Sequence, residues 1–533
     1  MQSVGERSQE TLSRAQRLVN RRANPSWDRN DTTIIVVAAI ATVFVHPVRA
    51  MLSHPYWLDE SWVAALTKAP FSRLTHLSAS APAGFIALLK LAPGSGLQRA
   101  RLVPLAFAVL SVVMAYVFAR SLSWGRRVDA RFGAVVAALV VMLAPLSLRR
   151  NDLKQYTCDA FCALVLLTLG SWAERDPRRS RLAYLAGAAV LAIPFSSTSA
   201  FVSVAMFAGL LASALLVRNW RRAIEVVVAG VVAAIGLGAY LGLVVLPTLN
   251  PKLKAYWATQ YLNGSPFHVV NATWNRLARF TTELSMPLPM FIVLFVIGIA
   301  VLVKLRTPAV AVAISFLWVE MAVMGRLRRY PYLDLRTSHF LFVVSLVVVA
   351  IGAAGFLQLI AHARRVFRGS TRLVTAIAIG SVMALLFTWA FAREVAQLQI
   401  PSENVRAEVL AVAERRTDRD IVLVNSSGTF GLGYYWPKGS IDFRKDTSGQ
   451  GFRPEVRGLH AVYAHGRTYE DVISALRTAV KRWRSVGGDS RLFIVRTHVS
   501  SQEIAAWKRA FGELGLHPRS DPVGSDPLLV LAG

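Results

Sequence analysis

The chain has 533 residues, of which 54% are apolar and 17% are charged, and its mean hydropathy is +0.44. Soluble globular chains carry about 25% charged residues and a smaller apolar share. This composition excludes a cytosolic enzyme, a disordered chain and a fibrous protein, and it indicates a membrane protein.

The net charge of +29 comes from 60 Lys and Arg residues against 31 Asp and Glu residues. In a soluble protein such an excess would indicate nucleic-acid binding. From Arg393 onward, however, 20 basic residues stand against 16 acidic ones, so nearly all of the excess lies in the apolar first 392 residues. Membrane proteins collect Lys and Arg in their cytoplasmic loops, and we therefore expect no nucleic-acid partner.

The first 32 residues are polar and lead directly into an apolar run. This pattern predicts a cytoplasmic N-terminal tail over 1–32 and no cleavable signal peptide. The two cysteines, Cys158 and Cys162, lie four residues apart in one apolar run, on one face of a helix. Such a pair offers neither a disulfide framework nor a cysteine-based zinc site.

About eleven apolar runs are long enough to cross a hydrocarbon core of about 30 Å, which takes roughly 17–25 helical residues. They lie at residues 33–50, 101–120, 132–148, 156–173, 182–197, 199–217, 223–246, 286–303, 307–324, 338–360 and 373–392. The chain is therefore predicted to be a polytopic α-helical membrane protein with a membrane domain over 33–392.

A shorter run, Pro82–Leu91, has too few residues to span. If it does not cross, the N-terminal tail and the basic short loops all fall on the cytoplasmic side, as the positive-inside rule requires. These loops lie at 120–131, 175–181, 218–222, 304–306 and 364–372. We therefore expect Pro82–Leu91 to be a helix lying at the outer surface, the N-terminus to be inside and the C-terminus outside.

This topology places residues 51–100, 149–155, 247–285 and 325–337 in outer loops, with the tail 393–533 also outside. The tail has helical patterns over 402–416 and 503–514 and from Thr468, whose Asp471 completes a capping box. Strand-like runs lie at 420–425, around Val462, at 492–495 and at 528–531. This alternation predicts a small extracytoplasmic α/β domain.

The first outer loop carries two adjacent carboxylates, Asp59 and Glu60, just after the first span. Acidic residues offset the dipole at a helix N-terminus, and this structural interpretation stays open. The flanking aromatics Tyr56, Trp57 and Trp62 make a half-apolar setting. That setting favours a functional interpretation, because it would raise a carboxyl pKa toward general-base use.

The second outer loop is basic although it lies outside, against the positive-inside pattern. Together with the start of the following span it carries Arg149, Arg150, Asp152, Lys154, Tyr156 and Asp159. The cations either snorkel toward lipid headgroups or form a site for an anion such as a phosphate. We expect Asp159, about one turn into the helix, to face a polar cavity.

The outer loop at 325–337 is also basic, and it holds Tyr330-Pro331 and Arg336. Two basic outer loops that converge on a carboxylate loop indicate an anionic lipid substrate. We interpret His339 as a packed or surface residue. The aromatic residues over 250–283 are interpreted first as an interfacial belt, with stacking on a sugar as the alternative.

The run Trp57-Leu58-Asp59-Glu60 resembles the Asp-Glu signature of the GT-C glycosyltransferases, and more narrowly of the protein-mannosyltransferase-like group that uses polyprenyl-phosphate sugars. Further motifs follow in the same order along most of the chain. Residues 80–85 resemble a degenerate form of the family's Pro-Pro-Leu-Tyr segment, and residues 99–105 resemble the Arg-Leu-Pro start of its second span. Asp152-x-Lys154-x-Tyr156 resembles the family's Glu-x-Arg-x-Tyr motif. Tyr330-Pro331 with Arg336 resembles its Tyr-Pro-x-Gly-x-Arg element. Residues 404–406, 420–424 and 434–435 are similar to the opening of the tail in bacterial members.

The resemblance implies a GT-C-like catalytic domain in a bacterial plasma membrane. It implies inverting transfer of a sugar from an outer-leaflet polyprenyl phosphate to an acceptor hydroxyl of a cell-envelope glycan, lipid or protein. Asp59 would be the general base, and Glu60 would orient it or serve the acceptor. A departing lipid phosphate carries two negative charges, which need fixed cations. The cations expected there are Lys154 and Arg336, then Arg149 and Arg150; the supporting residues are Tyr156, Asp152, Asp159, Tyr330 and His54.

Some GT-C enzymes need a divalent cation and others do not, and Asp152 or Glu283 is the candidate for a further carboxylate ligand. The resemblance therefore leaves a metal open and names no other cofactor.

A transporter or flippase for an anionic polyprenyl or glycolipid is the second interpretation. Such transporters often show internal repeats, broken helices and charges near the membrane midplane. In this sequence the polar clusters lie instead at the outer ends of the spans. A structural membrane protein whose tail recruits wall-assembly partners is the third interpretation. Only the enzyme requires Asp59, Lys154 and Arg336 to line one outer cavity.

The charge pattern predicts that the tail folds outside the cytoplasm as a separate α/β module. A reporter enzyme that is active only outside the cytoplasm should therefore be active when fused after Gly533. Activity of a cytoplasm-specific reporter at the same position would contradict the predicted topology.

Overall fold

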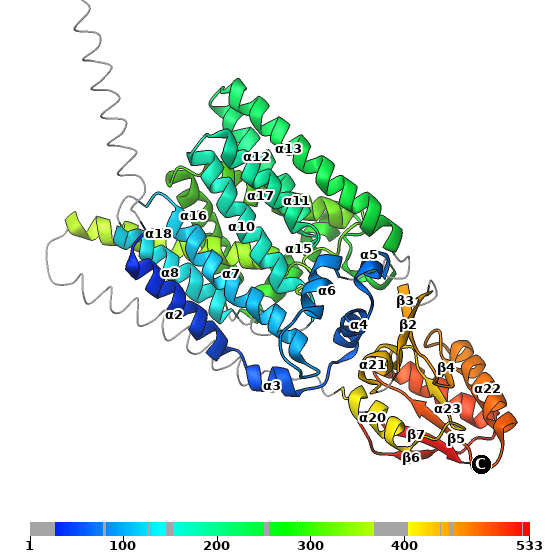
Figure 1. Ribbon diagram of the computed structural model, residues 1–533. Coiled ribbons are helices and arrows are strands. Elements are labelled where there is room, and N and C mark those ends of the chain that lie inside the picture. Colours follow the sequence, from blue (N-terminus) through cyan, green and yellow to red (C-terminus); the bar gives the residue numbers. More distant parts are fainter. Residues whose placement is uncertain are drawn as a thin grey trace, which may run out of the picture.

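The computed structural model describes residues 27–77, 81–124, 127–144, 153–249, 255–284, 286–366, 403–437, 439–446, 451–524 and 526–532. Along the described chain, a bundle of long helices extends to Val366, and a smaller part that contains the strands begins at Glu403 (Figure 1). We call this smaller part the tail domain.

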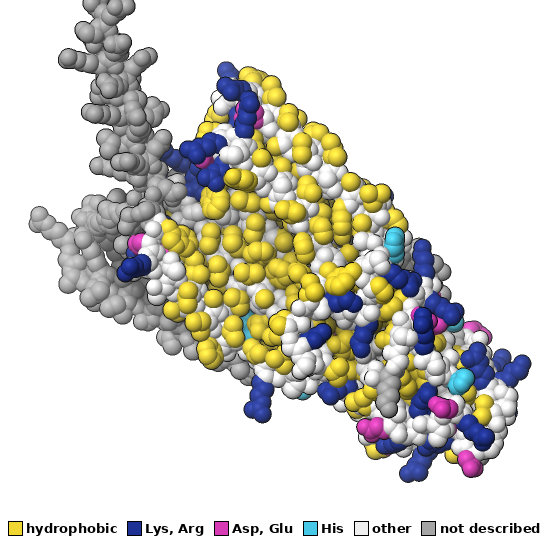
Figure 2. Space-filling view, in the orientation of Figure 1, with side chains coloured by type: hydrophobic (Ala, Val, Ile, Leu, Met, Phe, Trp, Pro, Cys, Tyr) yellow, Lys and Arg dark blue, Asp and Glu magenta, His cyan; other side chains and the backbone are white. Residues whose placement is uncertain are grey.

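The apolar runs form long helices because, in a membrane, the backbone N–H and C=O groups must find partners within their own segment. The bundle contains α2 (Arg29–Val45), α7 (Leu102–Ser121), α8 (Arg127–Leu143), α10 (Tyr156–Arg175), α11 (Arg179–Ala192), α12 (Ser199–Leu216), α13 (Trp220–Tyr240), α15 (Pro266–Glu283), α16 (Leu288–Lys304), α17 (Pro308–Arg326) and α18 (His339–Val366). Figure 2 shows a broad face of hydrophobic side chains over these helices, with Lys and Arg gathered toward its ends.

Six helices of the described chain are long and apolar enough to cross a membrane: Arg99–Ser121, Tyr156–Arg175, Ser199–Leu216, Trp220–Thr248, Pro308–Arg326 and His339–Gln358. The pair α15 and α16, bent by 94°, adds a seventh if it forms one broken span. The runs at 33–50, 132–148 and 182–197 also form helices, α2, α8 and α11, of 17, 17 and 14 residues. The run at 373–392 lies outside the described residues, so the number of eleven spans stays a prediction.

A buried ion pair fixes the first helix to the bundle. Asp31 on α2 is fully buried. Its carboxylate accepts hydrogen bonds from Arg120 Nε at 2.8 Å and from the Tyr116 hydroxyl at 2.7 Å, both on α7. Arg131 on α8 lies 3.4 Å from the same carboxylate. Because a buried carboxylate is stable only with such partners, these contacts hold α2 against α7 and α8.

The short apolar run at 82–91 forms α6 (Ala83–Lys90), whose eight residues extend only about 12 Å. This length agrees with the prediction that the run does not cross. Its position differs from the prediction, because α6 does not lie exposed on the surface. Phe85 and Ile86 are fully buried, and Gly84 N–H donates to the carbonyl of Pro194 at 2.8 Å. The helix is therefore packed into the end of the bundle that faces the tail domain.

The tail domain contains a five-stranded sheet in the order β4-β1-β5-β7-β6 and a separate hairpin of β2 and β3. The strands are β1 (Ile421–Val424), β2 (Ile441–Asp446), β3 (Gly451–Val456), β4 (Ala461–Tyr463), β5 (Arg491–Val495), β6 (Arg519–Asp521) and β7 (Leu528–Ala532). Strands β4, β1 and β5 are parallel, whereas β7 is antiparallel to β5 and to β6. The helices are α20 (Val405–Arg415), α21 (Gly428–Tyr435), α22 (Tyr469–Val486) and α23 (Ser501–Glu513).

Both faces of this sheet are buried, because successive side chains of a strand point in opposite directions. On β1, Ile421 and Leu423 pack in a core with α22 and α23, whereas Val422 and Val424 pack in a core with α20 and α21. The helices and strands predicted in the tail are confirmed for α20, α22, α23, β1, β4, β5 and β7, and the capping box at Thr468 is present. Helix α21, the β2–β3 hairpin and β6 were not predicted from the sequence.

The tail domain is less separate than predicted, because its second core continues into the first outer loop. That loop forms α3 (Val48–Ser53), α4 (Leu58–Leu66) and α5 (Leu74–Leu77). The ring of Trp62 on α4 lies 6.0 Å from that of Phe430 on α21, and the ring of Tyr56 lies 5.3 Å from that of Tyr434. Tyr56 N–H donates to the Tyr435 hydroxyl at 2.7 Å. The outer loop and the tail domain thus form one packed unit.

Candidate active site

Arg101, just before α7, fixes the first outer loop. It is buried, and its guanidinium forms an ion pair with Glu60, with Nε donating to Oε1 at 2.8 Å. The same guanidinium donates to the backbone carbonyls of His54 at 2.8 Å, of Pro55 at 3.1 Å and of Met51. Because one side chain binds three carbonyls and a carboxylate, the loop can present α4 in only one orientation.

Glu60 has two structural contacts in this arrangement. It is buried, pairs with Arg101, and accepts a hydrogen bond from the backbone N–H of Trp57 at 3.4 Å, at the start of α4. Its carboxylate is thus held at the helix start by buried partners. This geometry favours a positioning role for Glu60 and leaves Asp59 as the carboxylate that remains partly accessible.

Asp59 lies in the first turn of α4 and pairs with Arg336, which comes from the loop before α18. Each of these two side chains is 23% exposed. Asp334 orders the Arg336 backbone, because its carboxylate accepts the N–H groups of Arg336 at 3.1 Å and of Thr337 at 2.9 Å. The loop before α18 therefore holds the Arg336 guanidinium in a defined position against Asp59.

Aromatic rings surround the two cations of the site. The guanidinium of Arg336 lies 5.2 Å from the ring centre of Trp57 and 5.9 Å from that of Tyr156. Lys154, just before α10, is buried, and its Nζ lies 4.7 Å from the ring centre of Trp62. Cation–π contacts of this kind hold a charged side chain in place while leaving its N–H groups able to donate.

The charges of these residues act on Asp59. Burial raises the pKa of Asp59, but Lys154, Arg336 and His498 lower it, and the net pKa lies below the usual value of an aspartate. Asp59 is therefore a carboxylate at neutral pH. The structure brings together Asp59, Lys154 and Arg336, which are far apart in the sequence.

Three further predicted residues lie beside this cluster. Tyr156 is the first residue of α10, and Asp159, one turn later, is fully buried near the hydroxyls of Ser196 and Thr198, which hydrogen-bond to it. The Tyr330 hydroxyl donates to the Thr337 carbonyl at 2.8 Å, next to Arg336. These contacts support the N-terminal ends of α10 and α18.

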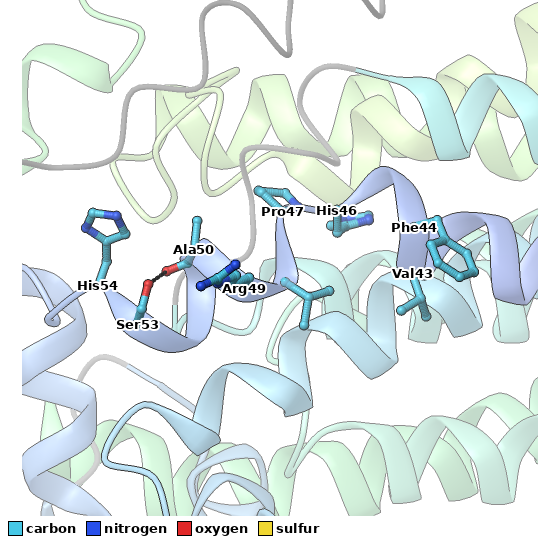
Figure 3. Close-up of a pocket in the computed structure, with 9 residues that line it drawn as sticks. Val43, Phe44, His46, Pro47, Arg49, Ala50, Ser53 and His54 are labelled. Atoms are coloured by element: carbon cyan, nitrogen blue, oxygen red, sulfur yellow. Dashed lines mark hydrogen bonds between the residues drawn. The ribbon is translucent and has the colours of Figure 1, made fainter.

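The remaining predicted residues have other positions. Arg149, Arg150 and Asp152 lie outside the described residues. The side chain of His54 lines a groove of about 680 Å³ along residues 43–54, shown in Figure 3, and none of Asp59, Lys154 and Arg336 lines that groove. His54 therefore acts through its backbone carbonyl, which accepts a hydrogen bond from Arg101, and its side chain is not part of the site around Asp59.

Two residues of the tail domain, Glu403 and His498, lie next to the turn that carries Asp59 and were not predicted from the sequence. The Glu403 carboxylate accepts the N–H of Leu58, the residue before Asp59, at 2.9 Å, and it pairs with His498. The pair of Arg101 with Glu60 was not predicted either, although two adjacent carboxylates in an apolar loop require a cation nearby. In the tail domain no sequence motif marked Glu403 or His498.

In the described part of the chain, no three His, Cys, Asp or Glu side chains are placed to hold a metal ion together. The partners of Asp59 are Arg336 and Lys154, which are cations and compete with a metal ion for the carboxylate. The residues described around Asp59 therefore do not fit a divalent cation.

Comparison with known proteins finds no matching family model and no matching curated protein. Among solved structures, the archaeal oligosaccharyltransferase AglB from Archaeoglobus fulgidus, in complex with an inhibitory peptide and a dolichol-phosphate, is 12% identical, with a TM-score of 0.51 over 88% of this chain and 70% of that one. ArnT from Cupriavidus metallidurans, in the apo state, is 14% identical, with a TM-score of 0.54 over 94% of this chain and 98% of that one.

These likenesses show that the chain has the GT-C fold, as the resemblance of its sequence motifs predicted. The match to ArnT covers so much of this chain that it includes most of the tail domain as well as the helices. The chain is thus a helical protein of the GT-C fold with several helices apolar enough to span a membrane.

The contacts of Glu60 and Asp59 predict that these neighbouring carboxylates differ in how much they contribute to the stability of the protein. Arg101→Gln leaves Glu60 buried without its charge partner, and the free energy of unfolding should fall by about 3–5 kcal/mol. Asp59→Asn should leave it within about 0.5 kcal/mol, because Asp59 is partly exposed. Denaturant unfolding in detergent, followed by tryptophan fluorescence, measures both. An Arg101→Gln protein as stable as the unmodified protein would contradict the structural role of this pair.

Proposed function

We propose that the protein is an integral membrane glycosyltransferase that moves a sugar from a polyprenyl-phosphate donor to a hydroxyl of a cell-envelope glycan, lipid or protein. The observation that carries this proposal is the convergence of Asp59, Lys154 and Arg336 beside aromatic rings. A partly accessible carboxylate next to two cations suits a reaction that removes a proton and releases a phosphate. The GT-C fold, shared with an oligosaccharyltransferase whose structure contains dolichol-phosphate, supports the same reaction class.

The donor phosphate is bound by Lys154 and Arg336 in this proposal. Both residues belong to the helical part of the chain, at the beginnings of α10 and α18. A polyprenyl chain stays among lipids and membrane helices, so its phosphate lies where these helices begin. The cations act most strongly on the leaving group, since a polyprenyl phosphate gains a second negative charge when its bond to the sugar breaks.

Asp59 is the general base. The acceptor oxygen forms a bond to the anomeric carbon of the sugar, the bond from that carbon to the phosphate oxygen breaks, and the hydroxyl proton passes to the Asp59 carboxylate. A single displacement of this kind inverts the anomeric carbon. Glu60 and Arg101 hold α4 so that Asp59 faces the reacting hydroxyl.

Donor binding and base strength are coupled in this site. Arg336 pairs with Asp59, and a donor phosphate competes for the same guanidinium. When Arg336 turns to the phosphate, the Asp59 carboxylate loses a cation that lowers its pKa, and it becomes a stronger base. The site therefore activates the base when the sugar donor is present, which limits reaction with the wrong partner.

The topology proposed with this function has the N-terminus in the cytoplasm and the tail domain outside a bacterial plasma membrane. Lys154 and Arg336 then lie at the outer leaflet, where an envelope acceptor is accessible. The partners are the lipid-linked donor, the acceptor and the surrounding membrane lipid, with no nucleic acid.

Asp59→Asn tests the base. The change keeps the shape of the side chain but removes the charge that accepts the proton, so transfer should fall by about 10²–10⁴-fold. Donor binding should not weaken, because Lys154 and Arg336 remain. The measurement is transfer of labelled sugar from polyprenyl phosphate in proteoliposomes, beside a donor-binding assay. Asp418→Asn, at a fully exposed carboxylate of the tail domain, is the matched control. Full activity of Asp59→Asn would remove this mechanism and favour the transporter interpretation.

Arg336→Gln and Lys154→Ala test the phosphate site. Each should weaken donor binding roughly 10- to 150-fold, the range for a lost hydrogen bond to a charged group. Arg326→Ala, at an exposed arginine at the end of α17, should leave binding unchanged.

The same Arg336→Gln variant makes a prediction about pH. Activity requires ionised Asp59, so kcat/KM falls as pH drops through the pKa of that group in the free enzyme. Arg336 lowers this pKa, and its removal should move the acid limb of the profile to higher pH. An unshifted acid limb, together with unchanged donor affinity, would refute the assignment of Arg336.

A further inference from the structure

A histidine of the tail domain lies beside the candidate base. His498 follows β5, and its Nδ1–H donates to Glu403. The other oxygen of Glu403 accepts the N–H of Leu58 at 2.9 Å, at the beginning of α4 and next to Asp59. Glu403 thus joins His498 to the helix turn that carries Asp59.

The backbone holds His498 in an unusual conformation. Its φ is 54°, in the left-handed region that few residues other than glycine adopt. The carboxylate of Asp526 accepts the backbone N–H groups of His498 and Val499, which stabilises this turn. The side chain stays 40% exposed, and within the described ranges its second ring nitrogen, Nε2, has no hydrogen-bond partner. Such conformations persist where the surroundings hold them, and they cluster at functional sites.

The charged groups around His498 favour its protonated form. Its pair with Glu403 raises the pKa of His498, burial and Arg467 lower it, and Asp59 raises it. Asp526 adds a negative charge at the backbone of the same turn. The net pKa lies above the usual value of a histidine, and both ring nitrogens carry hydrogen in the protonated form. In that form Nε2–H is a charged donor on a partly exposed side chain that interacts electrostatically with Asp59.

The two sides of Asp59 differ in what they can bind. Lys154 and Arg336 come from the helical bundle, where a lipid-linked donor is anchored. His498 comes from the tail domain, and Figure 1 places α4 between the bundle and the tail domain. A donor held at the bundle leaves the tail-domain side of Asp59 for the acceptor.

We infer that His498 is an acceptor-binding residue, whose Nε2–H donates a hydrogen bond to an oxygen of a hydroxyl-rich acceptor while Asp59 takes the proton of the attacking hydroxyl. This inference rests on the proposed function. In it, Glu403 and Asp526 are positioning residues, and the tail domain completes the active site rather than serving only as an attached module. No bond to His498 forms or breaks, and its proton stays on the ring.

His498→Asn is the main test, because asparagine also tolerates a positive φ and so keeps the turn while removing the titrating ring. Its KM for the acceptor should rise roughly 10- to 150-fold, the range for a lost hydrogen bond to a charged group, with donor affinity unchanged. The unmodified enzyme should lose activity as pH rises through the pKa of His498, and this alkaline limb should be absent in the variant. His517→Asn, at an exposed histidine of the tail domain, is the matched control.

Glu403→Gln gives a second, independent measurement. Glutamine still accepts the Leu58 N–H but carries no charge, so the pKa of His498 should fall and the alkaline limb should move to lower pH. An unchanged acceptor KM in His498→Asn, or an unmoved alkaline limb in Glu403→Gln, would overturn the role of His498. Either result would leave the glycosyltransferase proposal intact if Asp59→Asn is inactive, so the two failures are distinguishable.

Discussion

The contact on which the site depends is the one between Arg101 and the first outer loop. A single buried guanidinium binds the Glu60 carboxylate and the carbonyls of Met51, His54 and Pro55. The loop between α3 and α4 has little regular structure of its own, and these carbonyls would otherwise lack partners away from water. Because Arg101 stands at the beginning of a long helix of the bundle, it transmits the position of that helix to α4. The position of Asp59 is therefore determined by the helical bundle, through the contacts of Arg101.

Much of this organisation could be predicted from the sequence, since it depends on local patterns. The long apolar runs indicated the helices, and the short apolar run Ile421–Val424 indicated the buried strand β1. Asp59, Lys154 and Arg336 were identified by short motifs at the starts of helices, and the structure places them together. Each of these signals needs only the residues within a few positions along the chain.

The features that escaped prediction depend on contacts between distant segments. The sequence of α21, Gly428–Tyr435, contains three glycines and has no helical periodicity, yet all eight residues are buried. Packing on α4 and β3, rather than propensity, makes it helical. Likewise nothing near Glu403 or His498 in the sequence indicates that Glu403 contacts both Leu58 and His498. Their function is visible only once the tail domain is seated on the outer loop.

The shared aromatic core has a consequence for how the chain matures. Tyr56 and its hydrogen-bond partner Tyr435 are separated by 379 residues. At translation rates of about 5–20 residues per second, the aromatic face of α4 waits roughly 20–75 s for the segment that covers it. During that interval the nascent chain exposes an apolar patch that chaperones and proteases can detect. A product that terminates before α21 keeps this patch permanently. The aromatic side chains of the first outer loop are therefore covered only when the whole polypeptide has been made and its tail domain has folded against that loop. The site around Asp59 is completed at the same step.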